Sequence, residues 1–133
     1  MSVLTYDAGE RCNYQYVVVE IDRFLTELSR DELIEVLVAE NILARRYFYP
    51  GCHRMEPYAS LFPHASLVLR ATDIVAERVL LLPTGTAVGP EEIVQICQVM
   101  RLAVTGAGDV RQVLEARRRA ENHVTPGDER KVA

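Results

Sequence analysis

An uninterrupted apolar run at residues 17–19, Val-Val-Val, constrains the fold more than any other feature of the sequence. It lies in the middle of residues 14–21, which are rich in aromatic and β-branched residues and therefore favour a strand. A strand that is apolar at consecutive positions offers both of its faces for burial. We therefore expect residues 14–21 to form a strand inside a sheet, with residues 17–19 buried on both faces.

The next segment carries the signals of a helix that begins and ends within the chain. Ser29, with Glu32 three residues later, forms a capping box. The apolar positions that follow share one face of a helix: Leu33, Ile34, Leu37 and Val38. Asn41 suits the left-handed end of this helix. Two more strands are predicted, over residues 42–49 and 79–82.

The middle and later parts of the chain predict a long loop and two further helices. Residues 52–69 are interrupted by prolines and show no period, so we expect an irregular loop, and loops of this length are often functional. A short helix is expected from Thr72 or Asp73 to about residue 78. Pro90 suits the first position of another helix. The expected buried stripe of that helix consists of Ile93, Ile96, Cys97 and Met100.

The order of these elements predicts an α/β fold in which a small sheet is packed with helices. We expect a leading segment at residues 1–12, a folded domain at residues 13–104 and an extra C-terminal helix at residues 105–121. Residues 122–133 are polar and contain Pro-Gly, which is typical of a disordered tail.

The charge and hydropathy of the chain argue against nucleic acid and membrane as partners. The net charge of −4 disfavours binding to a phosphate backbone. The apolar stretches are far shorter than the roughly 20 residues that a spanning helix needs. Three cysteines without a C-x-x-C spacing indicate reduced thiols in a cytoplasmic protein: Cys12, Cys52 and Cys97. The three histidines show no metal-ligand spacing, so no metal site is expected.

Residues 45–58 carry most of the candidate binding chemistry, at a place where a predicted strand ends and a loop begins. They contain arginines, which can bind phosphate through two hydrogen bonds, and tyrosines, which can both stack and hydrogen-bond. Packing explains the segment as a whole equally well, and it is the favoured explanation for any single residue. Cys52 and His53 are adjacent, and adjacent side chains point apart, so we do not expect a nucleophile–base pair there.

Several motifs, taken together, resemble the small domain of DegT/StrS-type sugar aminotransferases. Residues 13–18, Asn-Tyr-Gln-Tyr-Val-Val, are similar to the strand that opens that domain. A helix at residues 30–40 follows, and residues 49–53 match the family's Tyr-Pro-x-x-His motif. Residues 76–83 match its Ala-Glu-Arg-Val-Leu-x-Leu-Pro motif, and a Glu-Glu-Ile helix begins at Glu91. The resemblance covers the chain in order from about Asn13 to Val104.

The resemblance implies the C-terminal small domain of a fold-type I transaminase that depends on pyridoxal phosphate (PLP) and acts on nucleotide-linked keto-deoxy sugars. In that family the Schiff-base lysine and the cofactor cradle lie in a large N-terminal domain. The single lysine of this chain, Lys131, lies in the polar tail and matches no lysine motif of the family. The resemblance therefore implies a truncated homologue that binds no cofactor and has no catalytic residue by itself.

The same resemblance implies which residues contact the substrate and which partners the chain needs. Tyr49 and His53 match the motif at the mouth of the active site, where the nucleotide-sugar binds, and Arg46 is added because of its chemistry. The partner is either a second copy of the chain or another chain that carries the large PLP domain.

Two alternative functions stay open at this stage. One is a non-catalytic interaction or dimerisation module, and the other is a small sugar-modifying enzyme that uses Cys52 or His53. An exposed apolar patch would favour the interaction module or the truncated transaminase, whereas a closed pocket around His53 would favour the small enzyme.

Overall fold

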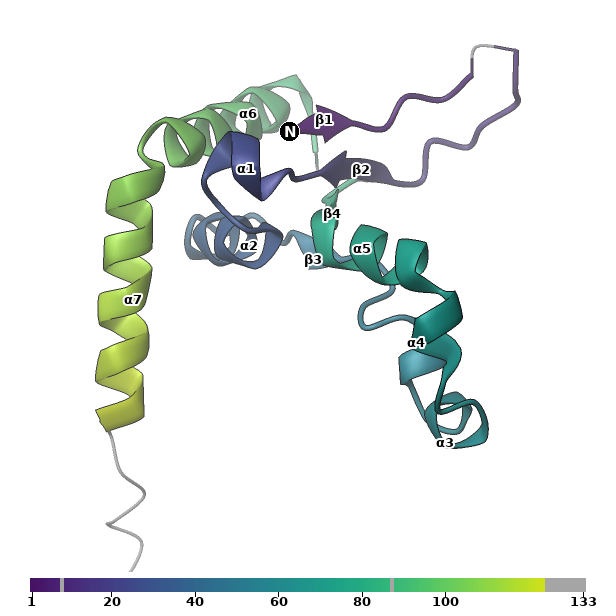
Figure 1. Cartoon of the computed structure of the whole chain (residues 1–133). Coiled ribbons are helices and arrows are strands. Elements are labelled where there is room, and N and C mark those ends of the chain that lie inside the picture. The colour runs from purple at the N-terminus through teal and green to yellow at the C-terminus, as the bar shows by residue number, and fades with distance from the viewer. Residues whose placement is uncertain (8, 87, 124–133) are drawn as a thin grey trace, which may run out of the picture.

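The computed structural model describes residues 1–7, 9–86 and 88–123, and its centre is a four-stranded antiparallel sheet (Figure 1). The strand order is β1-β2-β4-β3. The strands are β1 (Ser2–Val3), β2 (Val17–Glu20), β3 (Arg45–Arg46) and β4 (Val79–Leu82). The helices are α1 (Arg23–Thr26), α2 (Arg30–Ala39), η1 (Cys52–Arg54), α3 (Tyr58–Leu61), α4 (Ala65–Val68), α5 (Arg70–Arg78), α6 (Pro90–Thr105) and α7 (Ala107–His123). The expected α/β class, a small sheet packed with helices, is confirmed.

Three parts of the chain project from the sheet and its helices in Figure 1. The segment between β1 and β2 extends on one side. Residues 52–78, which we call the arm, carry η1 and α3 to α5 away from the sheet on another side. Helix α7 turns sharply from α6 at Gly106 and runs away from the sheet. The arm is the projection that positions the candidate site.

A compact set of leucines forms the centre of the hydrophobic core, which we call the sheet core. Leu28, Leu33, Leu37 and Leu80 have no exposed surface, and Val19 is almost as deeply buried. Helix α6 adds three residues at helical spacing, which are Ile96, Met100 and Ala103. Burial of each large side chain stabilises the fold by roughly 1.5–3 kcal/mol. The contacts among these residues fix α2 and α6 against the sheet.

Strand β2 lies inside the sheet, as expected, but it is shorter than residues 14–21 and is not buried on both faces. Val19 faces the helices, Val18 is half-buried on the opposite face, and Val17 is exposed near the end of the strand. The reason is that the helices of the sheet core pack on the Val19 side. The backbone at Tyr14 is left-handed, with a φ of 49°, which ends the extended segment.

Helix α2 begins and ends where the sequence predicts. The Glu32 backbone N–H donates to Ser29 Oγ at 3.2 Å, and the Ser29 backbone N–H donates to Glu32 Oε2 at 2.8 Å, so the capping box is confirmed. Asn41 adopts the expected left-handed conformation, with a φ of 59°. Ile34 is half-buried, but Val38 is exposed, so the apolar stripe is narrower than expected.

The predictions for residues 42–69 were largely wrong. The expected strand over residues 42–49 is reduced to β3, because Phe48 turns the backbone into the left-handed region at a φ of 43°. Residues 52–69 form η1, α3 and α4 in place of an irregular loop. These helices have three or four residues each, which is too short for any period to appear in the sequence.

The later elements agree better with the sequence. Strand β4 has the predicted bounds, and Pro90 is the first residue of α6. Helix α5 begins at Arg70, before the expected cap at Thr72 or Asp73, and Leu69 takes the N-cap position. The stripe of α6 was wrong at two positions, because Ile93 and Cys97 are both exposed.

The ends of the chain add one strand and one long helix. Residues of the expected leading segment form β1 and extend the sheet through pairing with β2. Helix α7 reaches His123, and the rest of the expected tail, residues 124–133, lies outside the described residues. Among the described helices, none combines the length and the apolar character that crossing a bilayer requires.

Candidate functional site

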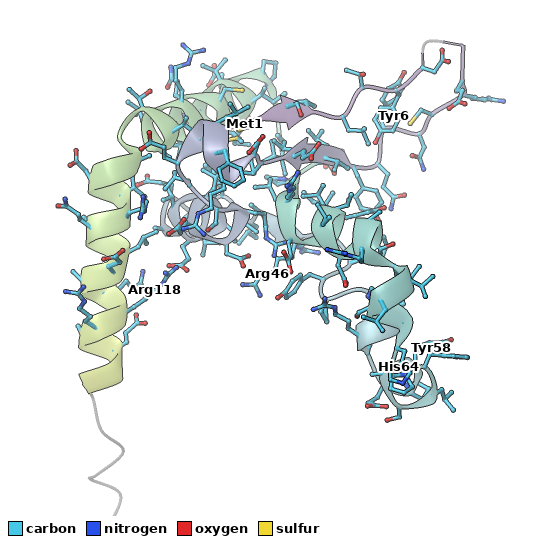
Figure 2. The ribbon with its side chains drawn as sticks, viewed as in Figure 1. Met1, Tyr6, Arg46, Tyr58, His64 and Arg118 are labelled. Carbon is cyan, nitrogen blue, oxygen red and sulfur yellow. The ribbon has the colours of Figure 1, made fainter. Side chains whose placement is uncertain are left out.

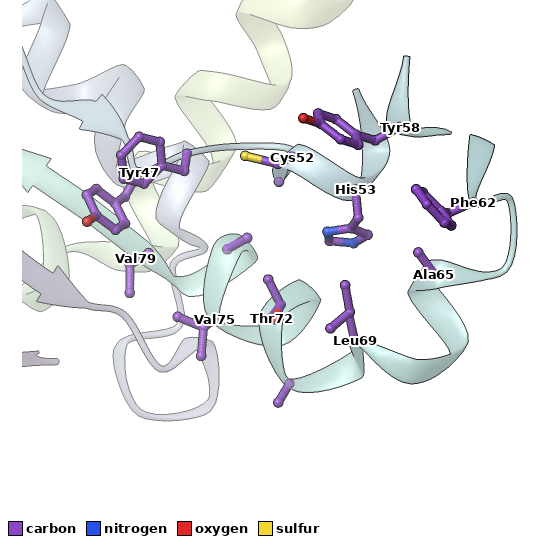
Figure 3. Close-up of a pocket in the computed structure, with 14 residues that line it drawn as sticks. Tyr47, Cys52, His53, Tyr58, Phe62, Ala65, Leu69, Thr72, Val75 and Val79 are labelled. Carbon is purple, nitrogen blue, oxygen red and sulfur yellow. The ribbon is translucent and has the colours of Figure 1, made fainter. Parts of the chain in front are cut away.

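A cavity of about 880 Å³ lies where the arm joins the sheet (Figure 3). The segment after β3, the helices of the arm and the first residue of β4 contribute to its wall. Most of the lining is apolar, from Tyr47, Phe48, Tyr58, Phe62, Leu69 and Val75. His53, Cys52 and Thr72 supply its polar groups. An apolar cavity with few polar groups is typical of a binding site for a small molecule.

Gly51 allows the backbone turn that places the His53 ring at the wall of this cavity. Its φ of 101° lies in a region that side chains with a Cβ rarely adopt. A Cβ atom at this position would lie 2.9 Å from His53 Cε1 and 3.1 Å from His53 Nδ1. The absence of a side chain therefore lets the His53 ring fold back beside the Gly51 backbone.

His53 is held in the cavity wall by a carboxylate from α5. Its Nε2 atom lies 2.8 Å from Asp73 Oδ1, and Arg54 Nη2 donates to Asp73 Oδ2 at 2.7 Å. The side chains of His53 and Asp73 are only 8% and 13% exposed. The hydrogen bond from Arg54 is the main cause that lowers the pKa of Asp73; burial opposes it and His53 adds to it. Asp73 is therefore ionised and shared between two donors.

Arg30 joins the start of α2 to the end of α5 and the beginning of β4. Its side chain is buried, and Nη1 donates to the carbonyl oxygens of Ala76, at 2.6 Å, and of Val79, at 3.2 Å. Its Nε atom lies 2.7 Å from Asp31 Oδ1. The guanidinium also lies over the ring of Tyr49, 4.8 Å from the ring centre. Tyr49 is thus placed by a residue that is itself fixed to the sheet.

Arg46 contacts Asp31 and Tyr49 from the solvent side. Its Nε donates to Asp31 Oδ1 at 2.8 Å, and its guanidinium lies 5.2 Å from the centre of the Tyr49 ring. Partial burial raises the pKa of Asp31, but the hydrogen bond from Arg46 and the charge of Arg30 outweigh it, so that pKa lies below its ordinary value. The Arg46 side chain remains about half exposed, at 51%, and can still reach an anion.

The structure brings two of the three predicted substrate-binding residues together and places the third elsewhere. Arg46 and Tyr49 are in direct contact, and Tyr49 lines a smaller cavity of about 330 Å³ with Arg30 and Asp31. His53 lines the larger cavity instead. Whether any of the three binds substrate stays a prediction.

Three residues of these clusters were missed by sequence reasoning as members of a site, namely Arg30, Asp31 and Asp73. Arg54 lies in the predicted segment at residues 45–58 but was not singled out. The contact between His53 and Asp73 joins residues 20 positions apart, across helices too short to show a period. Arg30 reaches carbonyl groups 46 and 49 positions away. No local pattern could have identified these pairings.

The sequence also led to expectations about cysteine chemistry and metal binding. The Cys52 sulfur points away from the His53 ring in Figure 3, as expected for adjacent residues. The three cysteines are free thiols. Within the part of the chain that the structure describes, no group of three or more potential ligands could hold a metal ion.

Comparison of this chain with known proteins gives matches in sequence and in structure that agree with one another. The sequence model of the DegT/DnrJ/EryC1/StrS aminotransferase family matches residues 2–101. A dTDP-4-amino-4,6-dideoxy-D-glucose transaminase of Escherichia coli is 36% identical over 88 residues, which are 66% of this chain and 24% of that protein. A crystal structure of DesI in the presence of its TDP-sugar product superposes with a TM-score of 0.73 and 44% identity, over 89% of this chain and 28% of that chain. This chain therefore spans about a quarter of the length of these relatives.

Proposed function

Because this chain belongs to the DegT/DnrJ/EryC1/StrS aminotransferase family, we propose that it is the C-terminal small domain, or a truncated homologue, of a PLP-dependent aminotransferase that acts on nucleotide-linked keto-deoxy sugars. The observation that carries the proposal is the likeness to DesI, because 44% identity over 89% of this chain is high for a shared fold alone. The DesI structure was determined in the presence of its TDP-sugar product, and the Escherichia coli relative is named for a dTDP-linked amino sugar.

The described residues do not fit PLP. When bound, this cofactor supplies the electron sink for transamination and is held by a lysine through a Schiff base. The chain has a single lysine, Lys131, which lies outside the described residues, and none of the side chains around the two cavities is a primary amine. We therefore propose that this polypeptide by itself performs no turnover.

The role proposed for this chain is to bind and orient the nucleotide-sugar. The half-exposed guanidinium of Arg46 is suited to a phosphate oxygen of a nucleoside diphosphate. The ring of Tyr49 is kept in place by two guanidinium groups and offers its hydroxyl and its edge to a sugar or base. His53 adds a hydrogen-bonding ring to a mostly apolar cavity, which suits a sugar that has lost a hydroxyl group.

The proposal can be tested with the purified chain and PLP. We expect no Schiff-base absorbance and no borohydride-reducible adduct at a defined position, and we expect no amination of a dTDP-linked keto sugar. Addition of an aminotransferase domain that carries the lysine and cofactor site should restore turnover if this chain supplies the substrate-binding half. Amination of a keto sugar by this chain alone would contradict the proposal.

A non-catalytic interaction or dimerisation module is the second candidate, and one observation favours it. Helices α3 and α4 and the link between them expose large apolar side chains beside the cavity. They are Leu61, Phe62, Leu67 and Val68. We propose that this face contacts either a second copy of the chain or a chain with the PLP domain. Sedimentation of the chain alone and in mixture separates the two partners.

A further inference from the structure

The hydrogen bond between His53 and Asp73 defines which ring nitrogen of His53 carries a proton. A carboxylate can only accept hydrogen bonds, so His53 Nε2, at 2.8 Å from Asp73 Oδ1, must be the donor. The lowered pKa of Asp73 supports the ionised form of this carboxylate. In the neutral ring the other nitrogen, Nδ1, is then a hydrogen-bond acceptor.

Arg54 occupies the other oxygen of the Asp73 carboxylate and so keeps Oδ1 directed at His53. Its Nη2 donates to the second carboxylate oxygen of Asp73 at 2.7 Å, so both oxygens of the carboxylate have a donor. The three groups come from two elements, because His53 and Arg54 belong to η1 and Asp73 lies in the first turn of α5. The carboxylate of Asp73 therefore fixes the orientation of the His53 ring relative to α5.

The Nδ1 side of the ring faces the part of the cavity wall that lacks a side chain. Gly51 lines the cavity, and a Cβ atom there would lie 3.1 Å from Nδ1. No hydrogen bond to Nδ1 is made by any residue that the structure describes. Figure 3 shows the ring within the cavity, near Leu69 and Phe62.

We propose that Asp73 is a positioning residue, which holds His53 with Nε2–H toward its carboxylate and so presents Nδ1 as the hydrogen-bond acceptor of the cavity. A ligand that binds at His53 must then bring a donor, such as a hydroxyl or amino group, together with an apolar body that fits the remaining wall. The identification of that ligand as a nucleotide-sugar rests on the proposed function, but the tautomer of His53 does not.

Nitrogen NMR of the ring in the isolated chain tests the tautomer directly. In the wild type we expect the neutral ring to carry its proton on Nε2, with an Nε2–H signal that is protected from exchange because the side chain is 8% exposed. A neutral ring with its proton on Nδ1, or an Nε2–H that exchanges freely, would overturn the proposal. This measurement decides the question even if a variant of Asp73 does not fold.

Asp73→Asn should invert the tautomer. The amide oxygen must still accept from Arg54, so the amide NH₂ faces His53 Nε2, which must accept, and the proton moves to Nδ1. The double variant with Arg54→Ala frees the amide to rotate and should restore the Nε2–H form. Asp109→Asn, which makes the same charge change in α7, should leave the ring unchanged. A folded Asp73→Asn chain with the wild-type tautomer would contradict the proposal.

Binding of a dTDP-linked 6-deoxy sugar then connects the tautomer to function. If the wild type binds this probe, Asp73→Asn should weaken binding by about tenfold or more, because a hydrogen bond to a ring of the wrong tautomer is lost. The Asp109→Asn control should bind as the wild type does. Equal binding by Asp73→Asn and wild type would overturn the positioning role. No binding by the wild type, with the tautomer as expected, would count against the proposed function and not against the role of Asp73.

Discussion

The sheet core and the arm hold their apolar residues in opposite ways. In the sheet core, Leu33, Leu37 and Leu80 are completely buried between the sheet and α2 and α6. In the arm, Leu61 and Leu67 are mostly exposed, and Figure 2 shows Tyr58 and His64 at its far end, well away from Arg46 near the sheet. The sheet core therefore depends on apolar packing, whereas the arm depends on a few hydrogen bonds and ion pairs and leaves its apolar surface available for contact.

Substitution of a leucine in each region should give the largest difference. Leu37→Ala removes a fully buried side chain and should lower the free energy of unfolding by about 3 kcal/mol, from lost burial and the cavity that remains. Leu61→Ala in the arm should change it by less than about 0.5 kcal/mol, because that side chain is 65% exposed. Urea unfolding of both variants measures this; equal losses would contradict the comparison.

Two glycines with left-handed backbones, Gly51 just before the arm and Gly85 after β4, separate the cost of backbone strain from the cost of a side-chain clash. Gly51→Ala should cost about 2 kcal/mol, because it adds backbone strain and pushes against the His53 ring. Gly85→Ala, at a φ of 122° and with open space around it, should cost about 1 kcal/mol from strain alone. Only Gly51→Ala should also disturb the ring signals of His53. If both variants lose the same stability, the ring contact contributes nothing.

Loss of the capping box at the start of α2 should lower the stability by less than the loss of a buried leucine in the sheet core. Ser29→Ala removes the oxygen that accepts from the Glu32 backbone N–H and should cost about 1 kcal/mol. Ser60→Ala removes an exposed hydroxyl that donates to Glu56 in the arm, and should cost less than about 0.5 kcal/mol. Thermal unfolding of the two variants should therefore rank them in this order.

Acid should produce the smallest change in the free energy of unfolding, through protonation of Asp31. Its pKa is lowered in the folded chain, so its stabilising contribution is complete above the ordinary aspartate pKa of about 3.9 and is lost as the pH falls through the folded value. The carboxylate is partly exposed, so the loss should stay below about 1 kcal/mol. Asp31→Asn should reduce the stability difference between about pH 6 and about pH 3. An unchanged difference would contradict the assignment.

The sequence correctly predicted helix ends, because these depend on residues that are neighbours in the chain. Ser29 with Glu32, Asn41 and Pro90 each occupy the expected position, because caps and turns depend on neighbouring residues. The stripe of α6 was partly wrong because the choice between Cys97 and Ala103 depends on how the helix rotates against α2, which is a tertiary contact.

The candidate site was predictable only as a segment. Residues 45–58 do line both cavities, and Arg46 and Tyr49 do meet. The partners that hold them could not be predicted, because Arg30 and Asp73 reach them across long separations in sequence. The one-turn helices of the arm also escaped prediction, since an isolated turn of helix has little intrinsic stability and is formed by its surroundings.

The two ends of the arm are anchored independently of what lies between them. Strand β3 pairs with β4 through Arg45 opposite Leu81 and Arg46 opposite Leu80, and Arg30 bonds to the carbonyl groups of Ala76 and Val79. For a connection whose ends are already fixed, each doubling of its length costs only about 0.6 kcal/mol in closure entropy. The length and shape of the arm are thus set separately from the register of the sheet, so a change within the arm should leave the pairing of β3 with β4 intact.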